Sequence, residues 1–117
     1  MFVERIENAY NATVESFEPT EYDMILNVSE AQRLKEYMRA VVENGTAKRL
    51  DNFSNLTVYG KTGTAQIEDG KMANSWFMGF AEGKKKTYAI AVVCEKVSSD
   101  SAPSTTIAGE IFKVLDK

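Results

Sequence analysis

The sequence has 117 residues, a length that fits one domain or part of a larger one. Its 17 acidic and 14 basic side chains give a formal net charge of −3, which argues against a nucleic-acid partner because such proteins present a basic face. Histidine is absent and Cys94 is the single cysteine, so we expect no metal, no cofactor and no disulfide framework. No apolar run has the length of a membrane anchor or the features of a signal segment.

The first quarter of the sequence predicts a β-hairpin. Residues 2–7 and 13–18 resemble two short strands, because modest apolar patterning flanks a turn-forming segment between them. We assign residues 1–28 to this hairpin and the connector that follows it, and residues 29–117 to a sheet with flanking helices.

An amphipathic helix is expected over residues 30–44. Ser29 and Gln32 have the spacing of a capping box, and Gly45 is expected to end the helix in the left-handed conformation that glycine tolerates. Lys35 lies outside the apolar stripe, which we expect to face the core. The stripe consists of Ala31, Leu34, Met38, Val41 and Val42.

Three consecutive strands and a closing helix complete the pattern. The strands are expected over residues 56–67, 74–81 and 87–94, and the short links between them imply antiparallel pairing. The second strand is apolar on both faces, which predicts cover on both sides, and the third is almost wholly apolar, as in a central buried strand. A helix over residues 103–116, with Pro103 in its first turn, gives an α+β fold in which helices flank an antiparallel sheet.

The segment Tyr59-Gly60-Lys61-Thr62-Gly63-Thr64-Ala65-Gln66 contains the residues best suited to chemistry. Its Gly-Lys-Thr fits the end of a phosphate-binding P-loop, but the first glycine of that motif falls on Asn55 and a helix should begin at the lysine. Its Lys-Thr-Gly fits a second motif, in which lysine offers a fixed charge and the threonines offer hydroxyl donors to a carboxylate. The glycine lets a substrate backbone lie close, and the next N–H can stabilise an oxyanion. The alternative without a functional role is a strand with an exposed lysine and a glycine bulge.

The surroundings extend this motif into an ordered series. Residues 38–47 precede it, and Trp76-Phe77-Met78-Gly79-Phe80-Ala81 and the apolar strand to Cys94 follow it. In this order the sequence resembles the C-terminal part of the transpeptidase domain of penicillin-binding proteins, closely over about residues 29–116 and more loosely over 1–28. The Thr-Ala-Gln that continues Lys-Thr-Gly is more similar to the monofunctional class B enzymes than to the bifunctional class A ones.

The resemblance implies a fragment of the fold shared by penicillin-binding proteins and β-lactamases. That family cross-links peptidoglycan at the extracytoplasmic face of the bacterial cell membrane: a serine attacks the D-Ala-D-Ala end of a stem peptide, and β-lactams acylate the same serine. By this resemblance Lys61 would be catalytic, assisting the proton relay and attracting the substrate carboxylate. The substrate-binding residues would be Thr62, Gly63 and Thr64, with the Thr64 N–H forming half of the oxyanion hole. Because strand residues alternate between faces, Lys61 and Thr62 can line one site only at a sheet edge.

The family also needs a serine followed three residues later by lysine, and a serine followed two residues later by asparagine. No serine of this sequence meets either requirement. We therefore expect that the chain alone neither cross-links peptides nor is acylated by penicillin, because it has no nucleophile. The stem peptide, β-lactams and the remainder of the transpeptidase domain are the expected partners in the full protein. Without that remainder, open apolar faces predict a homodimer or a domain-swapped assembly.

Two other interpretations stay open. D,D-carboxypeptidases, β-lactamases and β-lactam sensors share Lys-Thr-Gly, although the context of Gly45-Thr46-Ala47 and Trp76-Phe77 favours a transpeptidase. A non-catalytic module would instead use Lys61 and the strand edge to bind a peptide or a partner chain without chemistry.

Overall fold

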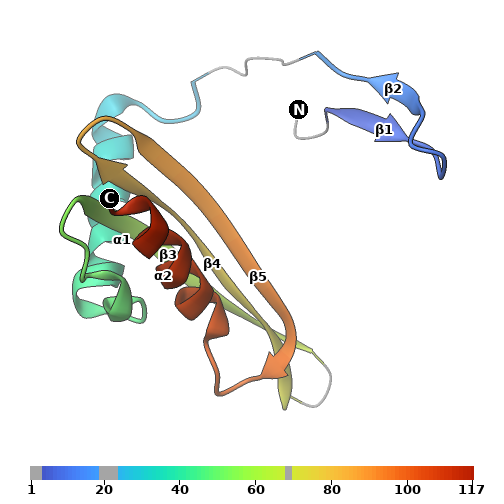
Figure 1. Cartoon of the computed structure of the whole chain (residues 1–117). Coiled ribbons are helices and arrows are strands. Elements are labelled where there is room, and N and C mark those ends of the chain that lie inside the picture. Colours follow the sequence, from blue (N-terminus) through green and yellow to red (C-terminus); the bar gives the residue numbers. More distant parts are fainter. Residues whose placement is uncertain (1–3, 19–23, 68–69) are drawn as a thin grey trace.

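The computed structural model describes residues 4–18, 24–67 and 70–117 and shows an α+β architecture (Figure 1). The order of elements is the expected one: a hairpin, a helix, three strands and a closing helix. Residues 2 and 3 of the first expected strand, and 19–23 of the connector, lie outside the described residues. In chain order the elements are β1 (Arg5–Glu7), β2 (Thr13–Ser16), α1 (Val28–Asn44), the short 3₁₀ helix η1 (Lys48–Leu50), β3 (Leu56–Ile67), β4 (Met72–Gly83), β5 (Thr87–Ser98) and α2 (Pro103–Leu115).

The three long strands form one antiparallel sheet in the order β3-β4-β5. This confirms the expected antiparallel pairing and places β4 in the centre. The prediction of a central buried strand over residues 87–94 is wrong for this chain, because β5 pairs with β4 alone among the described strands. Its side chains alternate between half-buried and exposed from Tyr88 to Cys94. The apolar composition of this strand indicates that it is suited to burial. It does not indicate which segment lies beside it.

The core lies on one face of the sheet, where α2, η1 and the end of α1 pack against β3 and β4. Phe77 of β4 is fully buried at its centre, and Ser75 and Ser104 join β4 to α2 through a buried hydrogen bond of 2.8 Å between their hydroxyls. The buried apolar residues of this cluster are Val42, Ala47, Leu50, Leu56, Val58, Phe77, Ala81, Ala108 and Phe112.

The opposite face of the sheet is open. Trp76, Met78 and Val93 lie on this face and are 44%, 60% and 43% exposed. The prediction that β4 is covered on both sides is therefore wrong for the middle of the strand within the part of the chain that the structure describes, since the face of Phe77 is covered there and that of Trp76 and Met78 is not. Exposure of these apolar side chains to water is unfavourable, and their burial is favourable. The open face is therefore a surface suited to contact with a partner.

The ends of α1 differ from those expected. The side chain of Asn27 accepts the N–H of Glu30 at 3.0 Å, and the Glu30 carboxylate accepts the N–H of Asn27 at 2.9 Å. The capping box thus uses Asn27 and Glu30 in place of Ser29 and Gln32, and the helix begins two residues earlier. Gly45 ends it in an extended conformation (φ −110°), not a left-handed one. Glycine is needed there because a Cβ would lie 2.8 Å from the carbonyl oxygen of Val41.

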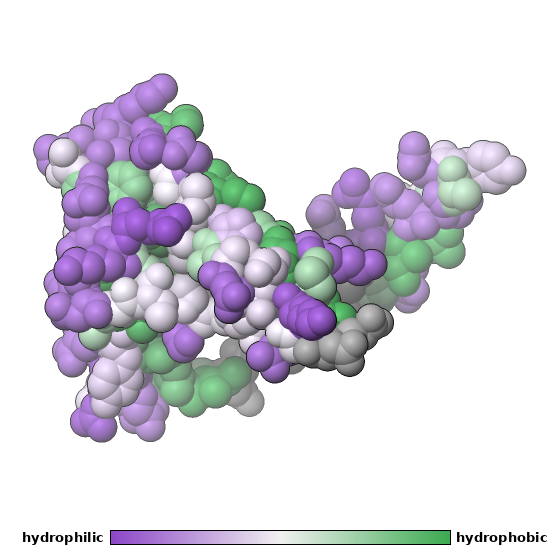
Figure 2. All heavy atoms as spheres, turned by 90° about the horizontal axis from the view of Figure 1, so that it is seen from below, coloured by the Kyte–Doolittle hydropathy of each residue, from purple (hydrophilic) through white to green (hydrophobic). Residues whose placement is uncertain are grey.

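The N-terminal hairpin forms a separate arm (Figure 2). Its two strands pair antiparallel with each other, and every residue of β1 and β2 is exposed. A two-stranded ribbon without a covered face is marginal by itself in water, so we expect this arm to gain stability from a surface that it contacts. No helix in the described residues has the length and apolarity needed to span a membrane.

Candidate functional site at the edge of β3

Residues 61–64 of β3, here named the Lys-Thr-Gly edge, lie midway along the strand at the border of the sheet. Lys61 and Thr64 are exposed, and Thr62 and Gly63 are half-buried. Within the described part of the chain β3 pairs with β4 alone, so the sheet-edge condition for a shared site is met. Lys61 pairs with Met78 of the open face, and Thr62 pairs with Phe77 of the core face. A strand runs through Lys61 where a P-loop needs the start of a helix, so the P-loop interpretation is excluded.

The backbone groups of β3 alternate between the neighbouring strand and the free edge. The carbonyl oxygens of Val58 and Thr62 accept hydrogen bonds from side chains, at 3.1 Å from Arg39 and 2.6 Å from the Lys61 ammonium. Both carbonyls therefore face away from β4. Thr64 is two residues beyond Thr62, so its N–H faces the free edge too. An outward N–H beside Gly63 is the kind of donor that an oxyanion hole requires.

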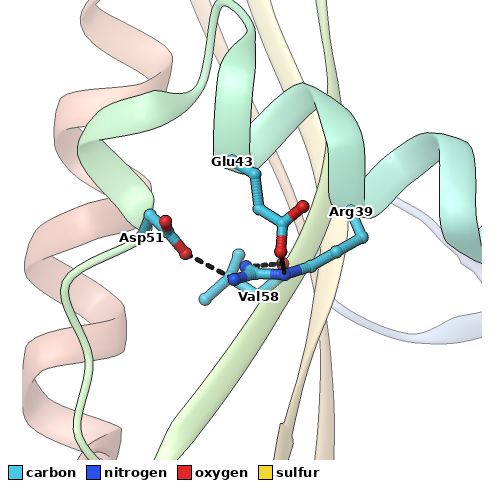
Figure 3. A network of polar contacts seen from close by, with 4 residues as sticks. All are labelled: Arg39, Glu43, Asp51 and Val58. Carbon is cyan, nitrogen blue, oxygen red and sulfur yellow. Dashed lines mark hydrogen bonds and ion pairs between the residues drawn. The ribbon is translucent and has the colours of Figure 1, made fainter.

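Arg39 occupies the free edge of β3 at Val58, before the Lys-Thr-Gly edge begins (Figure 3). Its guanidinium donates to the Val58 carbonyl and pairs with the carboxylates of Glu43, at 3.0 Å, and Asp51, at 2.5 Å. One side chain thus joins α1, β3 and the segment after η1. The free edge that remains open begins beyond it, at Lys61.

A second polar cluster fastens α1 to the same face of the sheet as Trp76 and Met78, but at the end of β4 that carries Glu82. The Lys35 ammonium lies 2.7 Å from the Glu82 carboxylate and 4.9 Å from the centre of the Tyr59 ring, which stacks on Phe80. The hydrogen bond with Glu82 raises the pKa of Lys35, and the same bond lowers the pKa of Glu82. Burial, and then the hydrogen bond with Glu82, raise the pKa of Tyr59. Lys35 lies outside the apolar stripe of α1, and its half-buried position follows from its distant carboxylate partner. The expectation that the whole stripe faces the core is wrong, because Val42 is buried but Leu34 is 49% exposed.

Thr46 is a site residue that sequence reasoning missed. Its hydroxyl oxygen lies 2.6 Å from that of Thr62, although the two residues are 16 positions apart. The only signal in the sequence was the run Gly45-Thr46-Ala47, in which a hydroxyl side chain stands between two small residues before the strand. That run contributed to the family resemblance, but it carried no role for the hydroxyl.

Helices packed against an antiparallel sheet, with an edge strand that carries Lys-Thr-Gly, define an α+β fragment of a transpeptidase-type fold. A family model of the penicillin binding protein transpeptidase domain matches residues 1–115. The chain therefore belongs to the penicillin-binding protein transpeptidase family, as the resemblance of its sequence indicated. The match includes residues 1–28, where that resemblance is looser. A comparison with curated proteins yields no match.

Proposed function

We propose that this chain supplies the carboxylate-binding strand of a D,D-transpeptidase that cross-links peptidoglycan through an acyl-serine intermediate. In this role Lys61 attracts the terminal carboxylate of a D-Ala-D-Ala stem peptide or of a β-lactam, and assists the proton relay. The hydroxyls of Thr62 and Thr64 donate hydrogen bonds to that carboxylate. The outward N–H of Thr64 forms half of the oxyanion hole for the substrate carbonyl.

Gly63 is the observation that carries this proposal. A Cβ added at Gly63 would meet only the Cβ of Trp76, at 3.4 Å, which is an ordinary contact. The same addition at Gly60 would lie 2.5 Å from the buried ring of Phe77, so the fold itself requires that glycine. Glycine weakens a strand by roughly 0.5–1 kcal/mol relative to alanine. Because packing does not explain Gly63, close approach of a substrate backbone to the free edge is the better explanation.

The charge of Lys61 supports the same role. Among the described residues no carboxylate pairs with Lys61, and its ammonium donates instead to the neighbouring Thr62 carbonyl at 2.6 Å. Lys35 and Arg39 on the adjacent helix are both neutralised by carboxylates. An incoming anion therefore finds one cation at this edge without a competing internal partner.

The nucleophile must come from outside this chain, because no serine here has the lysine three residues on that acylation requires. We propose that the remainder of the transpeptidase domain provides it, at the extracytoplasmic face of the bacterial membrane. The open face around Trp76, Met78 and Val93 and the free edge of β5 suit the packing of that remainder. In the isolated chain the same surfaces favour a homodimer or a domain-swapped assembly.

The test is a titration of the isotope-labelled chain with an N-acyl-D-Ala-D-Ala peptide, followed by backbone amide shifts. We expect shifts centred on Thr62 and Thr64 with the free carboxylate and none with the peptide amide. Lys61→Met should weaken binding by about tenfold or more, because a hydrogen-bonded charge is lost. Gly63→Ala should keep the fold and lose the response. Equal shifts with the amide peptide, or shifts confined to other elements, would refute carboxylate recognition by this edge.

A second measurement concerns catalysis. Incubation of the chain with penicillin, followed by intact-protein mass spectrometry, should show no covalent adduct. An acyl adduct would refute the proposal that the nucleophile lies outside this chain.

A further inference from the structure

Two hydroxyls meet beside the Lys-Thr-Gly edge. The Oγ1 atoms of Thr46 and Thr62 are 2.6 Å apart, at the short end of the range for an O–H···O hydrogen bond. Either hydroxyl can donate in such a pair, and each carries a single proton. When one proton lies between the two oxygens, the other is left to bind a third group.

The segment that carries Thr46 is fixed from both sides. The N–H groups of Gly45 and Ala47 both donate to the carbonyl of Val41, at 3.1 Å and 3.2 Å. Ala47 is fully buried, and Gly45 has no room for a Cβ. The exposed side chain of Thr46 therefore stands on a rigid turn, and its hydroxyl reaches β3 at Thr62.

We propose that Thr46 is a positioning residue, which fixes the rotamer and the proton of Thr62 for a carboxylate ligand. The carboxylate part of this inference rests on the function proposed above for the Lys-Thr-Gly edge. A carboxylate accepts hydrogen bonds and donates none, so Thr62 must direct its own proton outward. The Thr62 oxygen must then accept the proton of Thr46. The result is a chain of two hydroxyls that ends on the ligand, and each hydrogen bond in such a chain polarises the next.

Three variants separate positioning from packing. Thr46→Val removes the hydroxyl and keeps the branched shape, and Thr46→Ser keeps the hydroxyl. Thr106→Val is the matched control, because Thr106 lies on a different element, α2, and its exposed hydroxyl accepts a hydrogen bond from Arg49 of η1. All three should show thermal unfolding midpoints close to one another.

The first readout needs no ligand. Three-bond scalar couplings across χ1 of Thr62 should report one rotamer in the wild type, in Thr46→Ser and in Thr106→Val. In Thr46→Val they should report averaging between rotamers. A single Thr62 rotamer in Thr46→Val would overturn the inference, whatever the peptide titration shows.

The second readout is the titration with the N-acyl-D-Ala-D-Ala peptide. Thr46→Val should bind about three- to tenfold more weakly than the wild type, the range expected for one hydrogen bond. Thr46→Ser and Thr106→Val should bind as the wild type does. Weaker binding that Thr46→Ser does not restore, together with a lower unfolding midpoint, would assign Thr46 a structural role and overturn the inference. A wild-type chain that binds the peptide amide equally well would remove the proposed function and, with it, the carboxylate role of Thr46.

Discussion

Replacing Gly79 by alanine should force β3 and β4 apart beside the Lys-Thr-Gly edge. The added Cβ would lie 2.2 Å from the carbonyl oxygen of Tyr59 and 2.9 Å from the Cα of Gly60. Both are backbone atoms, so no side chain can rotate away to relieve the clash. Ordinary contact requires a separation greater by about 1 Å, which only a movement of one strand relative to the other can supply.

The cost follows from the position of Gly79 in the ladder. Gly79 pairs with Gly60, and the pairs on either side join Tyr59 to Phe80 and Lys61 to Met78. Separation of the strands weakens the hydrogen bonds of those flanking pairs, each worth about 1 kcal/mol. Overpacking of the backbone adds about 1–3 kcal/mol. We therefore expect the free energy of unfolding to fall by about 2–5 kcal/mol, a large part of the stability of a small domain.

Urea unfolding followed by far-ultraviolet circular dichroism measures this loss. Gly63→Ala is the matched variant, because it adds the same methyl group to the same strand pair without a clash. It should change the free energy of unfolding by less than about 1 kcal/mol, since alanine suits a strand at least as well as glycine. If Gly79→Ala and Gly63→Ala unfold at the same urea concentration, the close approach of the strands does not require glycine at position 79.

Three further changes test other parts of the structure. Phe77→Ala should cost about 3–5 kcal/mol in the same urea assay, because a fully buried ring leaves a cavity; a loss below about 1 kcal/mol would contradict its central place in the core. Asn27→Ala should cost about 1 kcal/mol through loss of the α1 cap, visible as faster amide exchange in the first turn, and unchanged exchange would count against the capping box. Glu82→Gln should reduce stability at pH 7. The Lys35 hydrogen bond lowers the pKa of Glu82, so the advantage of the wild type is present above the ordinary value of 4.5 and declines as pH falls below it. An equal difference in urea midpoint at pH 7 and pH 3 would exclude this linkage.

The elements were predictable because their signals are local. In β3 the buried residues Leu56, Val58 and Gly60 alternate with less buried ones, which is the period that marks a half-covered strand. The start of α1 was harder to predict, because the sequence offers two capping boxes of the same spacing, two residues apart. These are Asn27 with Glu30, which the structure uses, and Ser29 with Gln32.

The cover of the sheet was not predictable in the same way. Trp76 and Phe77 are adjacent aromatic residues on opposite faces, and their apolar character is equally compatible with burial of either face. The structure buries Phe77 because α2 and the end of α1 return to that side. The packing of Lys35 depends on a carboxylate 47 residues away, a distance over which no periodic pattern carries information.

The candidate site likewise has a part that the sequence could predict and a part that depends on packing. Lys61, Thr62, Gly63 and Thr64 could be selected as a group because they are contiguous and carry a motif whose chemistry is general. The contact between Thr46 and Thr62 joins a helix end to a strand, so it exists only once both have packed on the core. The distinction between Gly60 and Gly63 likewise depends on what lies opposite each in β4.

Trp76 gives the protein an optical probe of its own. It is the single tryptophan of the sequence, it pairs with Gly63 on one side and Val93 on the other, and 44% of its surface is exposed. Indole emission moves to shorter wavelength when water leaves the ring. Binding of a polypeptide over the open face, whether the remainder of the domain or a second copy, should therefore shift the Trp76 emission to shorter wavelength in unlabelled protein. The wavelength of that emission can be recorded over time, so it reports assembly next to the proposed binding edge as it occurs.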